Sequence, residues 1–245
     1  VALQEDIRQN ADEIESTRRV PEPLLTRLHD SRLFRLLLPR SVGGLEADPG
    51  TYYRSVEAVS AADASVGWNV FVANSSALIA PFLEPAVART IFSNPRTIVA
   101  WGPPNACTVS AAPGGYRISG AWEFASGCRQ ANWIGVHAHV CEADGHLRLN
   151  RYGRPTVRTL LMPITSATLM DTWTTIGLRG TGSDSYSIRD VFVREEFSST
   201  REDPALCREP GRLYAFTMQG LYAVGVAGVA IGTARAMLDA FVDLA

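Results

Sequence analysis

The sequence has few cysteines, and none of them forms a pattern that binds metal. It contains four cysteines without a Cys-x-x-Cys pair, and their spacing matches no common zinc-ligand pattern. We therefore expect four free thiols, which is typical of a reducing compartment and predicts a cytoplasmic location. His137 and His139 would share one face of a strand, but no third ligand is evident. We expect no metal site and two histidines that face outward.

A strong net charge and long apolar runs are also missing. The formal net charge is −2, which gives no electrostatic reason to bind nucleic acid or an anionic membrane. The longest apolar candidate, residues 222–231, is shorter than the roughly 18 residues of a membrane span, so no membrane is expected. The first residues lack the apolar core of a signal peptide. No Gly-x-Gly-x-x-Gly joins a strand to a helix, which argues against a nicotinamide site.

The first part of the chain, residues 1–96, has the pattern of a helical domain. Apolar residues recur at helical spacing from the start, and Pro21 and Pro23 suit the first turn of a new helix. Further helices are expected at 52–62, at 65–80, where an alanine-rich apolar run predicts a buried helix, and at 85–92.

Residues 97–205 are predicted to form a β-domain. Short β-rich segments are separated by Gly, Pro, Asn and Asp, and strands are expected at 97–101, 107–111, 116–122, 133–140, 159–163 and 186–193. Regular short strands with turns favour an antiparallel barrel or sandwich. Residues 143–146 fit a hairpin turn between two strands, and 148–158 should form an exposed excursion.

The last part, residues 206–245, is predicted to begin a C-terminal helical domain. One long helix is expected over 216–244, interrupted by Gly220, Gly225, Gly228 and Gly232. Each glycine costs a helix about 1 kcal/mol relative to alanine, so we expect another helix to pack closely there. The helix ends on an apolar face, which suggests a truncated bundle. The predicted fold class is α+β, with an all-α domain, a β-barrel or sandwich, and the start of a helical bundle.

Two glycine-punctuated segments place small hydroxyl residues beside aromatic ones. Residues 114–127 read GGYRISGAWEFASG, and residues 173–184 read WTTIGLRGTGSD. Both are predicted to be strand and turn. Such segments suit a flat ring with a polar edge, such as a flavin.

These segments resemble the acyl-CoA dehydrogenase superfamily, and within it the branch of reduced-flavin-dependent monooxygenases. The resemblance also includes LFRLLLPRSVGGL at 33–45, ADASVGW at 62–68 and GTARAMLD at 232–239. It covers the family's first two domains and the first helix of its third. Phe-x-Ser-Gly at 124–127, with no acid at 100–104, is similar to the monooxygenases rather than the dehydrogenases.

The resemblance implies a flavin-dependent monooxygenase that hydroxylates an aromatic or polycyclic small molecule. Reduced FMN or FAD would come from a flavin reductase, and the full-length protein would be a homo-oligomer. Ser126 would bond the polar edge of the flavin, and Arg179 would bind a phosphate or an anionic substrate. The implied cofactor-binding residues are Trp101, Phe124, Ser126, Gly127, Trp173, Arg179 and Thr181. The family's catalytic base lies in the later bundle, so no catalytic residue is named.

Simpler interpretations of the same residues stay open. Phe124 and Trp173 would be plain core aromatics, Ser126 a turn residue, and Arg179 a surface charge or a cap on a carbonyl. Asp184 and Asp190 are expected in turns or surface ion pairs, which contribute little.

Two other functions also stay open: an acyl-CoA dehydrogenase-like FAD dehydrogenase or oxidase, and a non-catalytic flavin-binding fragment. Related hydroxylases often have a basic residue at position 121, and a histidine is common at 129–130. This sequence has Ala121 and Arg129-Gln130 instead, which leaves the substrate open.

Overall fold

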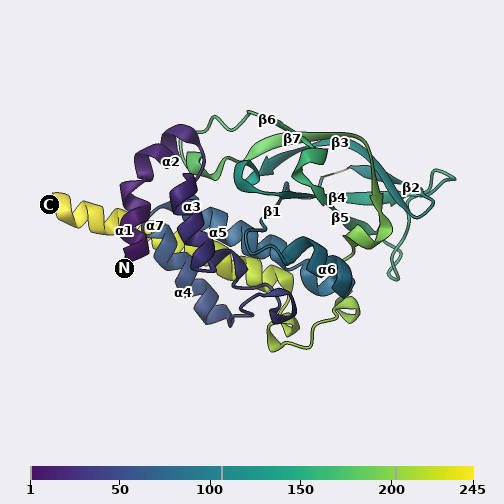
Figure 1. Ribbon diagram of the computed structural model, residues 1–245, viewed down its shortest axis with the longest axis horizontal. Coiled ribbons are helices and arrows are strands. Elements are labelled where there is room, and N and C mark those ends of the chain that lie inside the picture. Colours follow the sequence, from purple (N-terminus) through teal and green to yellow (C-terminus); the bar gives the residue numbers. More distant parts are fainter. Residues whose placement is uncertain (1, 106, 202) are drawn as a thin grey trace. The chain divides into compact units, whose positions relative to one another are not determined.

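A computed structural model describes residues 2–105, 107–201 and 203–245 of the chain (Figure 1). The chain forms two compact units. The helical unit comprises Val1–Leu78, Trp173–Gly182 and Pro210–Ala245, and the sheet unit comprises Ile79–Thr172 and Ser183–Glu209. These units combine segments that are distant in the sequence, whereas the boundaries expected from sequence texture, 1–96, 97–205 and 206–245, remain a prediction.

The helical unit contains most of the predicted helices, and side-chain caps mark the starts of α4 and α5. Its helices are α1 (Ala2–Gln9), α2 (Ala11–Thr17), α3 (Glu22–Asp30), α4 (Pro49–Ser60), α5 (Ala64–Ala77) and α7 (Met218–Leu244). The carboxylate of Asp48 accepts the Thr51 N–H before α4, and that of Asp63 accepts the Val66 N–H before α5. Most of α5 is buried, as its alanine-rich apolar sequence predicts.

Helix α7 packs so closely on α4 and α5 that its interior glycines have no room for a side chain. A Cβ at Gly225 would overlap Phe71, one at Gly228 would lie 3.0 Å from the Cβ of Val56, and one at Gly232 would overlap the carbonyl oxygen of Glu57. The predicted close helix contact is therefore confirmed. Gly220 differs because it lies in the first turn, where its N–H is capped by the Thr217 hydroxyl.

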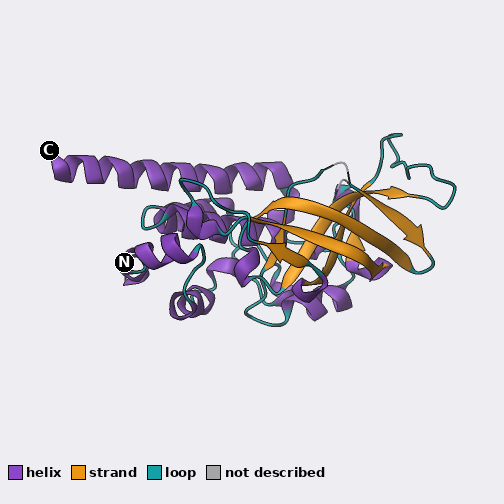
Figure 2. Cartoon of the chain, turned by 90° about the horizontal axis from the view of Figure 1, so that it is seen from above, coloured by secondary structure: helices purple, strands orange, loops and turns teal. Residues whose placement is uncertain are grey.

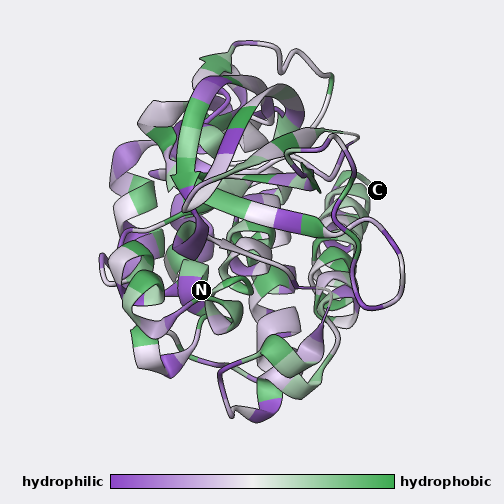
Figure 3. Cartoon of the chain, turned by 90° about the vertical axis from the view of Figure 1, so that its right-hand side faces the viewer, coloured by the Kyte–Doolittle hydropathy of each residue, from purple (hydrophilic) through white to green (hydrophobic). Residues whose placement is uncertain are grey.

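The far end of α7 exposes large apolar side chains, and Figure 3 shows hydrophobic residues recurring along this helix. The most exposed are Met237, Leu238, Phe241, Val242 and Leu244, each at least 61% exposed. By length and composition α7 could cross a membrane, so the expectation that no segment is long and apolar enough is wrong. Glycine and threonine interrupt the apolar run without making the helix polar. One such helix is weak evidence, since the core helix of a soluble protein passes the same test.

The sheet unit is built on one sheet, whose strands Figure 2 shows curving and twisting together. Its strands are β1 (Val99–Trp101), β2 (Thr108–Ala112), β3 (Gly115–Ala125), β4 (Trp133–Cys141), β5 (Val157–Pro163), β6 (Thr168–Met170), β7 (Asp184–Arg194) and β8 (Ser198–Ser199). The order is β6-β7-β3-β2-β4-β5-β8, with β1 paired to β4. Helix α6 (Pro85–Phe92) precedes β1 and matches its predicted range.

The predicted antiparallel sheet is confirmed in its main part. Strands β1 and β2 pair with β4 in parallel, and the remaining strand pairs between described residues are antiparallel. The short strands β6 and β8 were not predicted, because two or three residues show no alternation. The turn at 143–146 forms, but the chain returns only through an isolated bridge between Cys141 and Leu147 rather than a full hairpin.

The core of the sheet unit includes one residue that the sequence placed outside it. His137 is 2% exposed, and its Nδ1 lies 2.8 Å from the hydroxyl of Thr159, so the expectation that it faces outward is wrong. Strand β4 is buried on both faces here, which removes the usual alternation. All four cysteines are free, as predicted. Among the described residues, no group of three or more His, Cys, Asp or Glu side chains is placed to hold a metal.

Candidate functional site

The predicted flavin-binding residues divide between the two units. Trp101, Phe124, Ser126 and Gly127 belong to the sheet unit, and the remaining residues belong to the helical unit. Phe124, Ser126 and Gly127 lie together at the end of β3. The structure brings Trp173, Arg179 and Thr181 together in one loop of the helical unit.

Phe124 is held in an unusual backbone conformation at a β-bulge. The pairing of β3 with β7 shifts register between Trp122 and Ala125, and Phe124 in between has φ 61°. A left-handed backbone is uncommon for a bulky residue, and such strain concentrates at functional sites. The bulge turns the Phe124 side chain outward, where 55% of it is exposed. Phe124 is therefore not a core aromatic.

A cleft of about 460 Å³ lies beside Phe124 within the sheet unit. It is lined by Pro103, Pro104, Asn105, Ala121, Trp122, Glu123, Phe124, Met170, Thr172 and Ser185. This volume falls within the usual range of small-molecule sites, which combine apolar walls with a few polar groups. The described residues of this lining include no lysine, arginine or histidine, so the cleft suits an uncharged ring better than an anion.

Two serine hydroxyls meet next to this bulge. The Oγ of Ser126 lies 2.7 Å from the Oγ of Ser183, which precedes β7. The Ser126 N–H donates to the Phe124 carbonyl at 2.9 Å, and Gly127 follows with φ 76°, a conformation that glycine adopts at no steric cost. Ser126 is thus a turn residue, as one interpretation held. Its hydroxyl is also held by Ser183, which directly precedes β7.

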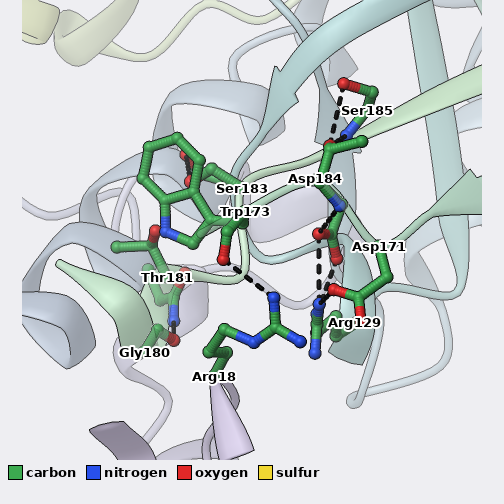
Figure 4. A network of polar contacts seen from close by, with 12 residues as sticks. Arg18, Arg129, Asp171, Trp173, Gly180, Thr181, Ser183, Asp184 and Ser185 are labelled. Carbon is green, nitrogen blue, oxygen red and sulfur yellow. Dashed lines mark hydrogen bonds and ion pairs between the residues drawn. The ribbon is translucent and has the colours of Figure 1, made fainter. Parts of the chain in front are cut away.

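A buried ion pair lies beside the serine pair. Arg129 donates to Asp184 from Nε at 2.6 Å and from Nη2 at 3.1 Å (Figure 4). The Thr172 N–H also donates to Asp184, at 3.1 Å. Asp184 is 2% exposed, so the expectation of a weak surface pair is wrong for it. These hydrogen bonds raise the pKa of Arg129 above its ordinary value.

Asp190, by contrast, forms the predicted surface pair. Its carboxylate lies 2.8 Å from Nη1 of Arg117, and both side chains are more than half exposed. Such exposed pairs contribute little to stability.

Two hydroxyl residues that were not predicted, Thr172 and Ser185, line the cleft. The Thr172 hydroxyl donates to the Ser185 Oγ at 3.0 Å and accepts the Ser185 N–H at 2.9 Å. Both flank the buried Asp184 in space. The sequence signal that could have identified them is the run of hydroxyl residues around Asp184.

Of the predicted flavin contacts in the sheet unit, Phe124 lines the cleft, whereas Trp101, Ser126 and Gly127 are not among its described lining residues. The Trp101 ring packs edge-on against His137, with centroids 4.8 Å apart, and the guanidinium of Arg201 lies 4.9 Å from the ring centroid. Burial, together with the charge of Arg201, lowers the pKa of His137 to about 3, so this histidine is neutral.

In the helical unit, the loop at 173–182 is held by its own hydrogen bonds. The Trp173 indole N–H donates to the Leu178 carbonyl at 3.0 Å, and the Thr181 hydroxyl donates to the same oxygen at 2.8 Å. Arg18 in turn donates to the Trp173 carbonyl at 2.9 Å (Figure 4). Asn69 donates to the Gly180 carbonyl at 3.1 Å, which fixes the loop against α5. Thr181 is therefore 2% exposed.

Arg179 caps carbonyls and forms an ion pair, which is one of the interpretations left open. Its guanidinium donates to the carbonyl oxygens of Glu15 and Thr175, both at 3.3 Å, and it lies 3.3 Å from the Glu15 carboxylate. These contacts hold the loop to α2. A flavin phosphate at Arg179 would have to compete with Glu15.

Comparison with known proteins agrees with this architecture. Residues 2–86 match the family of acyl-CoA dehydrogenase N-terminal domains. A curated relative from Rhizobium sp. (strain MTP-10005), the oxygenase component of an FADH2-dependent resorcinol hydroxylase, is 35% identical over 247 residues, which cover 96% of this chain and 58% of the relative.

Two solved structures share the fold over nearly the whole chain. The 3-HSA hydroxylase from Rhodococcus sp. RHA1 has a TM-score of 0.88 and 26% identity, and 99% of this chain and 62% of that chain are covered. XiaF from Streptomyces sp., solved with FADH2 and glycerol, has a TM-score of 0.86 and 28% identity, with 99% and 61% covered. The chain thus spans about three-fifths of the length of these relatives. In sequence and fold the chain resembles the acyl-CoA dehydrogenase superfamily, and the relatives that it matches are reduced-flavin-dependent monooxygenases.

Proposed function

We propose that this protein is the oxygenase component of a two-component flavin monooxygenase. It would take reduced FAD or FMN from a separate flavin reductase and use O2 to hydroxylate an aromatic or polycyclic small molecule. The observation that carries the proposal is the cleft in the sheet unit, where an outward-turned Phe124 stands two residues from the Ser126–Ser183 hydroxyl pair. The named activity and cofactor of the relatives support it.

The residues around the cleft fit a flat ring with one polar edge. Phe124 would pack on the ring face, and Met170 would extend the apolar wall that excludes water. Ser126 would hydrogen-bond the polar edge of the ring, with Ser183 fixing its hydroxyl. When bound, the reduced flavin supplies the electrons for oxygen chemistry. The protein would bind and orient the flavin and exclude water from it.

The other predicted residues would contact the cofactor as well. Trp173, Arg179 and Thr181 would bind the cofactor from the loop of the helical unit, with Arg179 exchanging Glu15 for a phosphate. Trp101 would contact the flavin from the sheet unit. A catalytic base is not assigned, and the homo-oligomer and the cytoplasmic location expected from the sequence remain proposals.

The activities named for the relatives favour this function over the acyl-CoA dehydrogenase-like alternative. FMN and FAD carry phosphates, as coenzyme A does, so the lack of arginine and lysine in the described lining of the cleft does not separate the two functions. That lining, whose one charged residue is Glu123, fits the uncharged ring system of a flavin or an aromatic substrate better than it fits a phosphate.

Oxygen labelling tests the proposal directly. The full-length protein would be incubated with FAD or FMN, NADH, a flavin reductase, 18O2 and a panel of phenols that includes resorcinol. We expect a product that carries one 18O atom and forms only when the reductase is present. Bleaching of protein-bound FAD by an acyl-CoA, without oxygen incorporation, would establish the dehydrogenase alternative. Flavin binding without either reaction would identify a non-catalytic flavin-binding protein.

A further inference from the structure

We infer that Arg129 is a positioning residue for the flavin site: through Asp184 it fixes Ser183 and thereby the hydroxyl of Ser126. This inference rests on the proposed function. It explains why a carboxylate is buried beside the two serines.

Two side-chain contacts join the same two segments. Ser126 and Arg129 leave the end of β3 together, and Ser183 and Asp184 enter β7 together. The Ser126–Ser183 contact of 2.7 Å and the Arg129–Asp184 contact of 2.6 Å therefore form a double link. The ladder between β3 and β7 ends at the Ala125–Asp184 pair, directly after the bulge at Phe124. Side chains thus fix the alignment of the two segments where the backbone pairing is irregular.

The geometry of the Arg129–Asp184 ion pair suits this role. Two nitrogens of Arg129 reach the two carboxylate oxygens of Asp184, which is the bidentate arrangement that gives both energy and direction. Asp184 is buried, and the Thr172 N–H supplies a further hydrogen bond. Figure 4 shows the Arg129 guanidinium directed at the carboxylates of Asp171 and Asp184. Arg129 is not among the described residues that line the cleft, and neither are Asp184, Ser183 and Ser126, so its effect would reach the site through the alignment of the two segments.

The chain provides matched variants that separate position from charge. Arg129→Lys keeps the charge but loses the planar two-nitrogen contact, so Asp184 retains a cation while the alignment loosens. Asp171→Asn is the control, because Asp171 pairs with the same arginine at 2.7 Å but its side chain is 65% exposed. An exposed pair contributes little, so this variant leaves the link to Asp184 in place.

The test is a double-mutant cycle on the binding of reduced flavin. The full-length protein, Arg129→Lys, Ser126→Ala and the double variant would be titrated anaerobically with FADH2 and FMNH2. We expect Arg129→Lys to weaken flavin binding about tenfold in the wild-type background. In the Ser126→Ala background it should weaken binding less than about twofold, because the effects of two substitutions that act through one contact do not add. Asp171→Asn should bind like wild type. Without flavin, amide hydrogen exchange at 124–128 and 183–185 should be faster in Arg129→Lys alone.

Several results would overturn the inference. Equal weakening by Arg129→Lys in both backgrounds would mean that Arg129 only supports the fold, and unchanged affinity would mean that it has no role at the site. If Arg129→Lys does not fold, a double variant takes its place in the cycle. This variant combines Arg129→Gln with Asp184→Asn and so removes both charges together. A wild-type protein that binds neither reduced flavin would remove the proposed function as well, whereas an additive cycle in a flavin-binding protein would remove this inference alone.

Discussion

The hydroxyl oxygens of Ser126 and Ser183 lie 2.7 Å apart, although 57 positions separate the two residues in the sequence. This contact joins the end of β3 to the start of β7 beside the cleft at Phe124. It makes Ser126 the side chain of the site whose position is best defined by a specific partner.

Removing the Ser126 hydroxyl should weaken flavin binding without unfolding the protein. Ser126→Ala is expected to raise the dissociation constant of the reduced flavin by roughly 3- to 12-fold, because one hydrogen bond contributes about 0.5–1.5 kcal/mol. Anaerobic fluorescence titration measures this change. Ser110→Ala, at an exposed serine of β2, is the matched control and should not alter binding. Equal affinities for wild type and Ser126→Ala would show that Ser126 serves only the turn.

Phe124 should show opposite effects on stability and binding. In Phe124→Gly the left-handed backbone is no longer strained, so the free energy of unfolding should stay the same or rise by about 1 kcal/mol, since glycine adopts φ 61° freely. Binding of flavin should weaken about tenfold, because the aromatic contact is lost. Urea unfolding and titration measure the two quantities. Phe192→Ala, at a 43%-exposed aromatic residue away from the cleft, should leave binding unchanged. A less stable Phe124→Gly variant with normal affinity would contradict this account.

Alanine in the buried face of α7 should destabilise the helical unit. Gly→Ala ordinarily stabilises a helix by about 1 kcal/mol. At Gly232 the added methyl group would overlap the Glu57 carbonyl, so Gly232→Ala should instead lower the free energy of unfolding by about 1–3 kcal/mol. Chemical denaturation measures this change in the free energy of unfolding. Gly220→Ala meets only the Thr217 hydroxyl, at 3.0 Å, and should be nearly neutral. A Gly232→Ala protein that is more stable than wild type would mean that α7 does not pack this closely.

The buried His137 should make the protein less stable in acid. Its pKa is about 3 in the folded state and 6.5 ordinarily, so below pH 6.5 the unfolded chain binds a proton that the folded chain rejects. Stability is therefore complete above pH 6.5 and should fall by up to about 1.4 kcal/mol per pH unit towards pH 3. Urea unfolding at several pH values should show a shallower fall for His137→Gln than for His146→Gln, whose histidine is exposed. Equal slopes in the two variants would exclude His137 as the cause.

Local sequence signals predicted most of the fold. The helices expected at 52–62, 65–80 and 85–92 form as α4, α5 and α6, and the structure adds the caps Asp48 and Asp63 at the starts of α4 and α5. The strands of five or more residues were also identified from their composition. The parallel pairing of β1 and β2 with β4 was not, because it depends on contacts distant in the sequence.

The site was predicted only in part, for the same physical reason. The segment from Phe124 to Gly127 was identified by its residue types, but the bulge that turns Phe124 outward depends on its register with β7. Asp184 looked like a surface acid because its partner, Arg129, is 55 positions away. The ring of Trp101 packs on His137, and its predicted contact with the flavin stays a prediction.

The most direct test of the central claim is anaerobic titration of the full-length protein with FADH2 and FMNH2, followed by the same titration of Phe124→Gly. The account predicts saturable binding of at least one reduced flavin by the wild type and about tenfold weaker binding by the variant. A folded wild-type protein that binds neither reduced flavin would contradict the account.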